Sequence, residues 1–575
     1  MTNHTTGRDE VADRLDPDDV ELTGNHYLAF PDLRTGTLAI GSINVLQRAL
    51  GGLLSWAGPQ GLRGPPLLRI RFRSEGREAD WERLGRERLD RWIPRVTGRL
   101  PGGPAIRVTI CAPGGFDPLV RGAVVHVELD GGPADGTVEV EFAVAWGEPV
   151  QTVVTSRPLA LSREAVPVDG GVVLEMGAAG RGAALALTVA GGSDRVSVED
   201  GSGPAGSGVK RFSLWKTVGV GGQGRAAVTL CLGVAAERDG AVATARRLEE
   251  LGGTDLVRRA RLDLAQLSRS PDDAGARDLL ARNLPFHHYF AAARAIDDDR
   301  MYPVMSRAPM NGGGAVFGER EALAWSLPAY CYTDPGVARE LLMRSLEVWS
   351  DRPGLHRRYA DGGIIDPGYS LGRACDWVLA VERYVALTRD ATILDEPLVQ
   401  QVLRELDDSL HRRLHRDIFL GRTEVLPGGE RADYPYSAFD NALLWKVCRV
   451  LPELWRAVDG EPPPRLSGGD EEVEAAFWRH CVTDFNGLRV IAGTTDLEGH
   501  AAIYDDPAGT VSLLPWLGFC PADDPILSDT LELLRSADYP LWLGGRAHPG
   551  LAPRARPGAA SFAALCAGLL SENRQ

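Results

Sequence analysis

The sequence predicts a two-part protein, with a β-rich N-terminal half followed by an all-helical C-terminal half. From about Glu21 to Glu237, short apolar segments are separated by Gly, Pro, Asp and Ser, a pattern typical of strands and turns. From Ala274 onward, apolar residues recur with a period close to 3.6, which is typical of amphipathic helices. A chain of 575 residues also exceeds the usual size of one domain, so two cores are expected.

The N-terminal half predicts a β-sandwich at residues 21–238, preceded by a polar tail at residues 1–20. Its clearest strand covers residues 138–146, where every second residue is apolar and the residues between them are Glu or Ala. Side chains two positions apart lie on the same face of a strand, so this strand should bury one face. Asp130-Gly131-Gly132 supplies a turn just before it, and short strands at this spacing are typical of a sandwich.

Residues 239–272 predict a charged helical linker, and residues 273–575 predict paired helices closed into a barrel. Asp334-Pro335 indicates a helix N-terminus, because Asp caps the first N–H groups and Pro fits the first turn. Long loops between such helices would form a pocket at one rim. Two apolar stripes predict further helices: Trp377, Ala380, Val381, Tyr384 and Leu387, and then Leu398, Val402, Leu406, Leu410 and Leu414.

Composition and charge exclude several classes of function. The net charge of −15 argues against nucleic acid as a partner, because binding a polyanion normally requires a basic surface. The first residues contain no apolar segment typical of a secretion signal, and no run of about 18 apolar residues follows. We therefore expect a cytoplasmic protein that binds neither nucleic acid nor membranes and that prefers neutral or cationic ligands.

Cysteine and histidine spacing predicts no disulfide, metal site or cofactor. The eight cysteines are scattered without a Cys-x-x-Cys spacing, and most lie in apolar runs, so reduced buried thiols are expected. His287-His288 lies in an aromatic helical run with no further ligand at metal-binding spacing, which favours packing over coordination.

The helical half contains several distinctive segments in a fixed order. These segments are Tyr302 to Pro309, Phe317 to Ala329, His356 to Gly362, Asp366 to Ser370, Tyr434 to Trp445 and Tyr504 to Phe519. With them, most of this half resembles bacterial metal-independent α-mannosidases (glycoside hydrolase family 125), and Thr23-Gly-Asn-His-Tyr27 is similar to the start of the N-terminal domain in longer relatives.

The resemblance implies an (α/α)6 barrel and exo-acting, metal-independent hydrolysis of α-mannosides with inversion. Inverting hydrolysis requires one carboxylic acid and one carboxylate across the scissile bond, about 6.5 to 9.5 Å apart. The implied partner is a carbohydrate or a glycosylated small molecule.

The sugar-binding candidates follow from the same segments. Glu319, Arg320 and Glu321 stand where the family has Asp-Arg-Asp; they form either a sugar-binding rim or the charged first turn of a helix. The family's next acidic segment has become Ser370 to Arg373, and Asp376 either replaces one of its carboxylates or caps a helix. The remaining binding candidates are His356, Arg358, Asp361, Tyr436 and Asn441.

Two residues are candidates for the catalytic acid. Glu424 occupies the place of the family's general acid and could donate a proton if a dry pocket raised its pKa; the alternative is a solvated loop residue. Asp440 is the second candidate, and Asn441 beside it could bind a sugar hydroxyl.

The catalytic base that the resemblance implies has no counterpart in its usual place. The chain passes directly from the segment of Trp542 into a small-residue helix expected after Pro557, and no glutamate lies between Glu532 and Glu572. This gap would also remove a helix pair from the barrel. The substitutes are Glu498, Asp505 and Asp506, although Asp505-Asp506-Pro507 is also typical of a structural turn.

Three functions remain open at the level of sequence. The first is a glycosidase acting on an α-linked, mannose-type sugar, with Glu424 or Asp440 as acid and a displaced base. The second is a pseudoenzyme that binds a glycan or glycosylated metabolite without cleaving it, because the acidic segment and the base are lost. The third is a barrel recruited to non-hydrolytic secondary metabolism.

Overall fold

The computed structural model describes most of the chain, and its contacts divide it into two compact units. Unit 1 comprises Met1–Phe317 and Tyr359–Gly363, and unit 2 comprises Gly318–Arg358 and Ile364–Gln575. The described residues are 20–74, 76–79, 82–114, 120–132, 136–152, 159–199, 208–220, 224–267, 274–308, 316–457, 463–545, 549–559 and 561.

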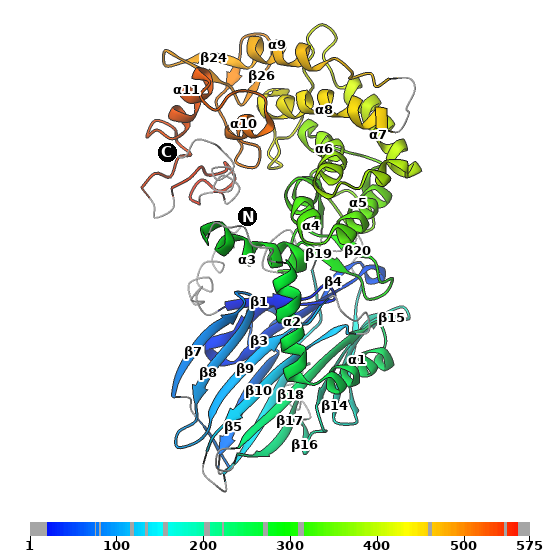
Figure 1. The fold of residues 1–575 in the computed structure, drawn as a ribbon, viewed down its shortest axis with the longest axis vertical. Helices are drawn as coiled ribbons and strands as arrows, with labels where there is room; N and C mark the ends of the chain where they lie inside the picture. The colour runs from blue at the N-terminus through cyan, green and yellow to red at the C-terminus, as the bar shows by residue number, and fades with distance from the viewer. Residues whose placement is uncertain are drawn as a thin grey trace, which may run out of the picture. The chain divides into compact units, whose positions relative to one another are not determined.

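Unit 1 contains a ten-stranded antiparallel sheet (Figure 1). Its main path runs β1-β2-β3-β5-β11-β17-β16, while β4 and β12 extend from β3, and β6 pairs with β5. The strands are β1 (Val20–Gly24), β2 (Leu28–Arg34), β3 (Ala39–Gln47), β4 (Gly52–Ala57), β5 (Leu68–Ser74), β6 (Arg77–Glu78), β11 (Thr137–Trp146), β12 (Val150–Thr152), β16 (Arg195–Glu199) and β17 (Lys210–Gly219).

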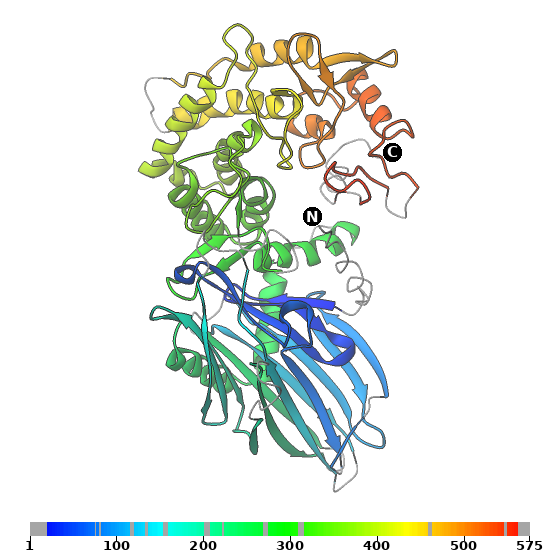
Figure 2. The ribbon, with the colours of Figure 1, turned by 180° about the vertical axis from the view of Figure 1, so that it is seen from behind.

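A second antiparallel sheet has eight strands in the order β13-β14-β15-β18-β10-β9-β8-β7. Figure 2 shows unit 1 from the side opposite to Figure 1, with β1 to β3 in front. The strands are β7 (Glu82–Leu89), β8 (Ile93–Arg99), β9 (Ala105–Cys111), β10 (Gly122–Asp130), β13 (Ser162–Val168), β14 (Gly171–Ala178), β15 (Arg181–Val189) and β18 (Arg225–Ala235).

The two sheets share one apolar core, which agrees with the predicted β-rich N-terminal half. Phe142 of β11 pairs with Leu214 of β17 and with Ile70 of β5, and all three side chains are buried. The same core includes Val125 of β10 and Leu185 of β15, from the other sheet. The alternation predicted for β11 therefore places its apolar face in this shared core.

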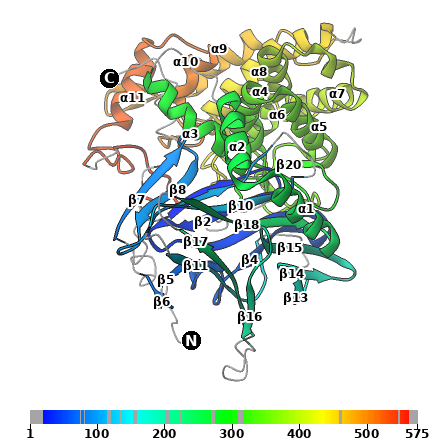
Figure 3. The same cartoon turned by 60° about the horizontal axis from the view of Figure 1, so that its bottom comes forward.

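Three helices follow the strands: α1 (Arg238–Leu251), α2 (Gly253–Leu267) and α3 (Ala274–Phe290). Leu248 of α1 and Leu256 of α2 are buried with Val124 and Cys231, which lie in the eight-stranded sheet. Figure 3 shows α1 beside β15 and β18. The contacts thus group these helices with unit 1, whereas the sequence assigned residues 239–272 to a separate linker; the predicted domain boundaries stay a prediction.

The packing of α1 on β18 leaves no room for a side chain at Gly233. A Cβ atom there would lie 2.3 Å from the carbonyl oxygen of Ala241 and 2.6 Å from the backbone nitrogen of Ala245, both in α1. We expect Gly233→Ala to lower the free energy of unfolding of unit 1 by about 1–3 kcal/mol, as other overpacking substitutions do. Urea unfolding measures this change, with Gly219→Ala as the control, because a Cβ at Gly219 meets no atom within 4 Å. Equal midpoints for the two variants would contradict the expectation.

Unit 2 is mainly helical, as predicted for the C-terminal half. Its first segment is a π-helix, η6 (Arg320–Ser326), which continues directly into α4 (Leu327–Thr333). The other principal elements are α5 (Pro335–Trp349), α6 (Leu371–Thr388), α7 (Pro397–Arg412), α8 (Ala438–Ala457), α9 (Asp470–His480), α10 (Leu514–Leu517) and α11 (Pro525–Leu534). Short strands connect them: β23 (Tyr436–Ser437), β24 (Val482–Phe485), β25 (Leu488–Ile491), β26 (Thr494–Thr495) and β27 (Ala501–Ala502).

Three of the predicted helices are present. Asp334 caps α5, since its side chain accepts a hydrogen bond from the N–H of Val337 at 3.1 Å, and the helix ends at Trp349. Most residues of the two predicted apolar stripes lie on the buried faces of α6 and α7. The exceptions are Leu387, which is exposed at the end of α6, Leu398, which is half-buried, and Leu414, which lies beyond the end of α7. The expected last helix after Pro557 lies outside the described residues, so the closed barrel and the loss of a helix pair stay predictions. Among the described helices, none is long and apolar enough to cross a membrane.

Candidate active site

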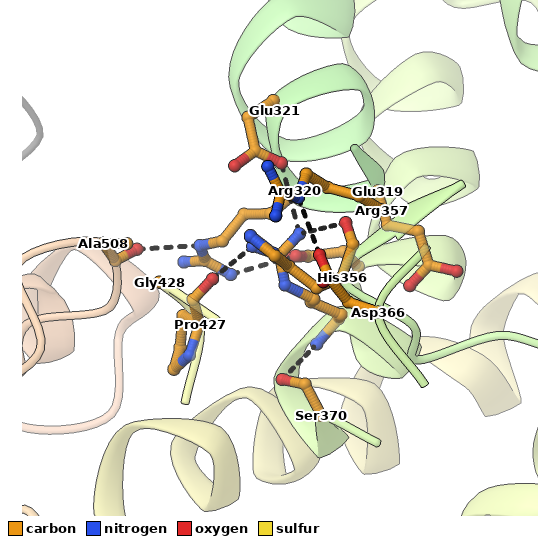
Figure 4. Close-up of polar contacts among 12 residues, drawn as sticks. Glu319, Arg320, Glu321, His356, Arg357, Asp366, Ser370, Pro427, Gly428 and Ala508 are labelled. Atoms are coloured by element: carbon orange, nitrogen blue, oxygen red, sulfur yellow. Dashed lines mark hydrogen bonds and ion pairs between the residues drawn. The ribbon is translucent and has the colours of Figure 1, made fainter. Parts of the chain in front are cut away.

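Arg320 joins three segments of unit 2 that lie far apart in the sequence. Its Nη1 atom lies 2.9 Å from Oδ2 of Asp376 in α6, and its Nε donates to the carbonyl oxygen of Ala508 at 2.8 Å (Figure 4). The guanidinium also lies over the ring of Phe439 in α8, 5.0 Å from the ring centre. The side chains of Arg320 and Asp376 are almost fully buried, so this ion pair is shielded from water.

Arg373 makes a second junction beside the first. Its Nη1 donates to Oε2 of Glu321 at 3.2 Å and to the carbonyl oxygen of His356 at 3.3 Å, and its Nη2 donates to the carbonyl of Pro427. Burial by itself would raise the pKa of Glu321, but the charge of Arg373 and its hydrogen bond outweigh burial and hold that pKa below its ordinary value. Burial and the charge of Arg373 lower the pKa of His356 to about 4, so this imidazole is neutral at pH 7.

Glu319 is fully buried next to this junction. The N–H of Gly354 donates to its Oε2 at 2.9 Å, while Oε1 has no hydrogen-bond partner among the described residues. Burial raises the pKa of Glu319 to about 8, although the Trp377 indole, the charge of Arg373 and the Gly354 N–H oppose the rise. The side chain therefore keeps its proton at pH 7.

The buried proton of Glu319 makes the stability of unit 2 depend on pH. The folded-state pKa of about 8 exceeds the ordinary value of 4.5, so between these values the folded protein holds a proton that the unfolded chain has released. Stability that is present below pH 4.5 is lost as the pH rises toward 8. Relative to wild type, Glu319→Gln should therefore gain about 3 kcal/mol of unfolding free energy between pH 5 and pH 8, at 1.36 kcal/mol per pH unit.

Urea unfolding of both proteins across this pH range measures the difference. Gln imitates the protonated side chain, since its amide oxygen can still accept from Gly354, so the two proteins should have similar stability at pH 5. Parallel pH profiles for wild type and variant would show that Glu319 is ionised in the folded protein.

Asp440, in the first turn of α8, is a buried carboxyl group without a hydrogen-bond partner among the described residues. Its Oδ1 lies close to the backbone of α6, because a Cβ atom built on Gly372 would be only 2.5 Å away. Burial raises the pKa of Asp440 to about 7; Thr423, Arg320 and the amide of Gly372 oppose the rise, and the charge of Asp506 adds to it. Asp440 can therefore hold or release a proton near neutral pH.

Asp505 and Asp506 organise the loop that receives Arg320. The N–H groups of Gly428 and Ala508 donate to the two carboxylate oxygens of Asp506, at 2.5 Å and 3.0 Å. Asp505 accepts from the hydroxyl of Thr510 and, at 2.9 Å, from the N–H of Val511. Burial is the largest influence on both groups, raising the pKa of Asp505 to about 7 and that of Asp506 above its ordinary range. These contacts are those of a structural turn, the alternative that the sequence offered for Asp505 and Asp506.

Glu424 and Glu498 lie in a different environment from these buried carboxyl groups. The Glu424 side chain is 59% exposed and lies 3.4 Å from Nη1 of Arg413. Glu498 is exposed in a turn, where its N–H donates to Asp496 at 2.8 Å. The dry pocket on which the role of Glu424 as acid depends is not found around it.

Several binding candidates bond mainly to the protein itself. Asn441 uses both ends of its amide, accepting from the N–H of Gly421 at 2.7 Å and donating to the carbonyls of Ser437 and Gly421. The hydroxyl of Tyr436 accepts from Nε of Arg422 at 2.8 Å.

Arg358 and Asp361 also form their contacts with residues close to them in the sequence. Arg358 donates to the carbonyl of Trp349 and pairs with Asp351. Asp361 accepts from the N–H of Gly363 at 3.0 Å and belongs to unit 1 by its contacts.

The site therefore collects part of the predicted set: Glu319, Arg320, Glu321, His356, Asp376, Asp440, Asp505 and Asp506. Asp376 is not a helix cap, because Ser370 caps α6 through the N–H of Arg373. In the described part of the chain, no group of three or more His, Cys, Asp or Glu side chains is arranged to hold a metal ion.

Comparisons with known proteins identify the fold. No protein-family model and no curated protein matches the sequence. Among solved structures, a bacterial glucoamylase complexed with acarbose is similar over 92% of this chain and 79% of its own, with a TM-score of 0.58 and 12% identity. The chain has a glycosidase-like fold.

Two other structures are similar at lower TM-scores. A metal-independent α-mannosidase from Streptococcus pneumoniae, in a non-productive complex with α-1,6-mannobiose, matches 56% of this chain and 86% of its own, with a TM-score of 0.46 and 15% identity. A putative kojibiose phosphorylase from the human microbiome matches 81% of this chain and 71% of its own, with a TM-score of 0.46 and 10% identity.

The sequence reasoning missed Arg373, which holds the site together. The signal was its position on α6, since Arg373 and Asp376 fall on the same side of the helix as the apolar stripe of Trp377 and Ala380. A charged residue within an apolar stripe must have a buried partner, and Arg373 and Asp376 have theirs in Glu321 and Arg320.

Proposed function

We propose that this protein is a glycosidase-like enzyme that hydrolyses an α-linked, mannose-type sugar with inversion and without a metal ion. The observation that carries the proposal is the contrast between Asp440 and Asp506. Burial raises the pKa of Asp440 to about 7, so a large fraction of its side chains is protonated at neutral pH. Burial also raises the pKa of Asp506, but Asp506 accepts a backbone N–H bond at each oxygen, and these two bonds oppose the rise by favouring its charged form.

This contrast supports a different role for each residue. A carboxyl group that keeps its proton near pH 7 is suited to be the general acid, and a carboxylate held by N–H donors is suited to be the base. Asp440 would protonate the glycosidic oxygen as the bond to the anomeric carbon breaks. Asp506 would remove a proton from the water molecule whose oxygen bonds to that carbon from the opposite face. Arg320 would keep the Asp506 loop close to α6 through its bond to Ala508.

Product stereochemistry tests the proposal. The purified protein should hydrolyse an aryl α-mannoside or an α-mannobiose, and proton NMR should detect β-mannose as the first product. If neither substrate is cleaved, the proposal in this form is wrong; if α-mannose appears first, the inverting mechanism is wrong.

One observation favours the pseudoenzyme as a second candidate. Both carboxylate oxygens of Asp440 are buried away from solvent, so a substrate could reach them only after a rearrangement of the surrounding loops. A protein that binds glycans without cleaving them would tolerate this burial. Calorimetry showing micromolar binding of a mannoside, together with no turnover of the same mannoside, would support this candidate, and measurable turnover would exclude it.

A further inference from the structure

Arg383 is a cation of unit 2 that the proposed reaction does not use. It lies on α6, seven residues after Asp376 and therefore on the same side of the helix. Its guanidinium carbon lies 5.2 Å from the ring centre of Trp516 in α10. The Trp516 side chain is itself 46% exposed, so part of its ring is open to solvent beside the arginine.

The charge of Arg383 is not balanced by the protein. Its Nη1 atom is buried and has no hydrogen-bond partner, and the side chain forms no ion pair with any described residue. Asp376 and Glu382 are the acidic groups that act on it, but Asp376 pairs with Arg320 instead. Arginine cannot escape burial by releasing its proton at neutral pH, so an unpaired and partly buried guanidinium is unfavourable.

The side chain as a whole remains partly exposed, so a ligand can approach it from solvent. A planar guanidinium binds the oxygens of a carboxylate or phosphate through two parallel hydrogen bonds, and these charge-assisted bonds are strong. An exposed indole face beside it suits the apolar side of a sugar ring, because tryptophan combines a large apolar surface with a polar edge. Arg383 and Trp516 thus offer an anion-binding group next to a stacking surface.

We infer that Arg383 and Trp516 form a subsite for a sugar that carries an anionic oxygen group, either a carboxylate or a phosphate. The anionic group would pair with Arg383 and the sugar ring would lie against Trp516. The inference rests on the proposed function only for the sugar; the need for an anion follows from the unpaired guanidinium. It refines the expectation of neutral or cationic ligands drawn from the net charge of −15, because the guanidinium of Arg383 forms no ion pair among the described residues.

Calorimetric titration of the full chain tests the subsite without requiring turnover. Mannose 6-phosphate and mannuronate distinguish the phosphate and carboxylate sources, mannose is the neutral comparison, and inorganic phosphate probes the anion alone. At least one anionic sugar should bind about 10-fold or more tightly than mannose, and Arg383→Gln should remove that preference. Trp516→Ala should weaken the binding of the anionic sugar while leaving the binding of inorganic phosphate nearly unchanged.

Two matched variants control for general effects. Arg449 also lies over a tryptophan, 5.0 Å from the ring centre of Trp445, but it is exposed; Arg449→Gln should leave binding unchanged. Trp325 is exposed to a similar degree as Trp516, so Trp325→Ala is the control for Trp516→Ala. Because Arg383 loses no hydrogen bond or ion pair on substitution, Arg383→Gln should unfold at a urea concentration no lower than wild type.

The outcomes separate this inference from the proposed function. If anionic sugars bind through Arg383 but no glycoside is cleaved, the subsite is supported and the proposed hydrolysis is wrong. If neutral mannosides are hydrolysed equally well by wild type and Arg383→Gln, and no anionic probe binds more tightly than mannose, the hydrolase stands and the subsite is wrong. Equal binding of the anionic sugars by Arg383→Gln and wild type would also overturn it.

Discussion

Asp440→Asn should lower the rate of α-mannoside hydrolysis by about 100-fold to 10,000-fold, the usual contribution of general acid–base catalysis. Asparagine has nearly the same size as aspartic acid, so it should fit beside Gly372, but it cannot protonate a leaving oxygen. Because burial raises the pKa of Asp440 to about 7, the wild-type rate should fall as the pH rises above 7 and this acid ionises. The kcat of both proteins for an aryl mannoside with a poor leaving group measures the effect.

Glu424→Gln is the matched control for this experiment. Glu424 is the other candidate acid, but its side chain is 59% exposed beside Arg413. A large loss in Asp440→Asn with little change in Glu424→Gln would support Asp440 as the acid. The reverse pattern would move the role to Glu424, and circular dichroism of each variant shows whether a loss reflects misfolding.

Arg320→Met should lower the free energy of unfolding of unit 2 by about 3–5 kcal/mol, the typical result of breaking a buried ion pair. The substitution leaves Asp376 buried without its cation and removes the bond to the carbonyl of Ala508. Desolvation would then dominate, so the pKa of Asp376, which burial already raises, would rise further. The midpoint and slope of urea unfolding give the change in free energy.

Two comparisons isolate the buried ion pair. Arg465→Met removes an arginine from an exposed pair with Asp408, and such pairs contribute about 1 kcal/mol or less, so its midpoint should scarcely move. Adding Asp376→Leu to Arg320→Met should recover much of the lost stability, because replacing both members of a buried pair by apolar residues is often neutral. A double variant less stable than Arg320→Met would mean that Asp376 stabilises the fold through other contacts.

The elements predicted best were those with a local physical signal. Asp334 caps α5 because a side-chain oxygen next to a proline satisfies the first free N–H groups, and this requires no information from distant residues. The β11 alternation also predicted a buried face correctly. The placement of α1 could not be predicted in this way, because its charged sequence hides a buried face that only the sheet reveals.

The sequence predicted which residues form the candidate site better than it predicted how deeply they are buried. Glu319, Arg320 and Asp376 were selected, but their burial depends on loops that are distant in the sequence, such as that of Ala508. Glu424 and Asp440 looked equivalent in the sequence. Only the fold shows that Glu424 lies in an exposed loop and that Asp440 is buried in the first turn of α8. Sequence pattern identifies residue types at the site; solvent access, which sets their pKa values, is a property of the assembled chain.

Because of the π-helix that begins at Arg320, the direction in which the Arg320 side chain points does not follow from the α-helical spacing of α4. In an α-helix each residue advances about 100° around the axis, whereas the wider turns of η6 accommodate extra chain length before α4. A helical wheel drawn back from α4 would therefore assign Arg320 to the wrong side. Deleting one residue between Arg320 and Ser326 would remove this extra length, so regular α-helical bonding could form while Arg320 stays on the side of the helix that faces Asp376.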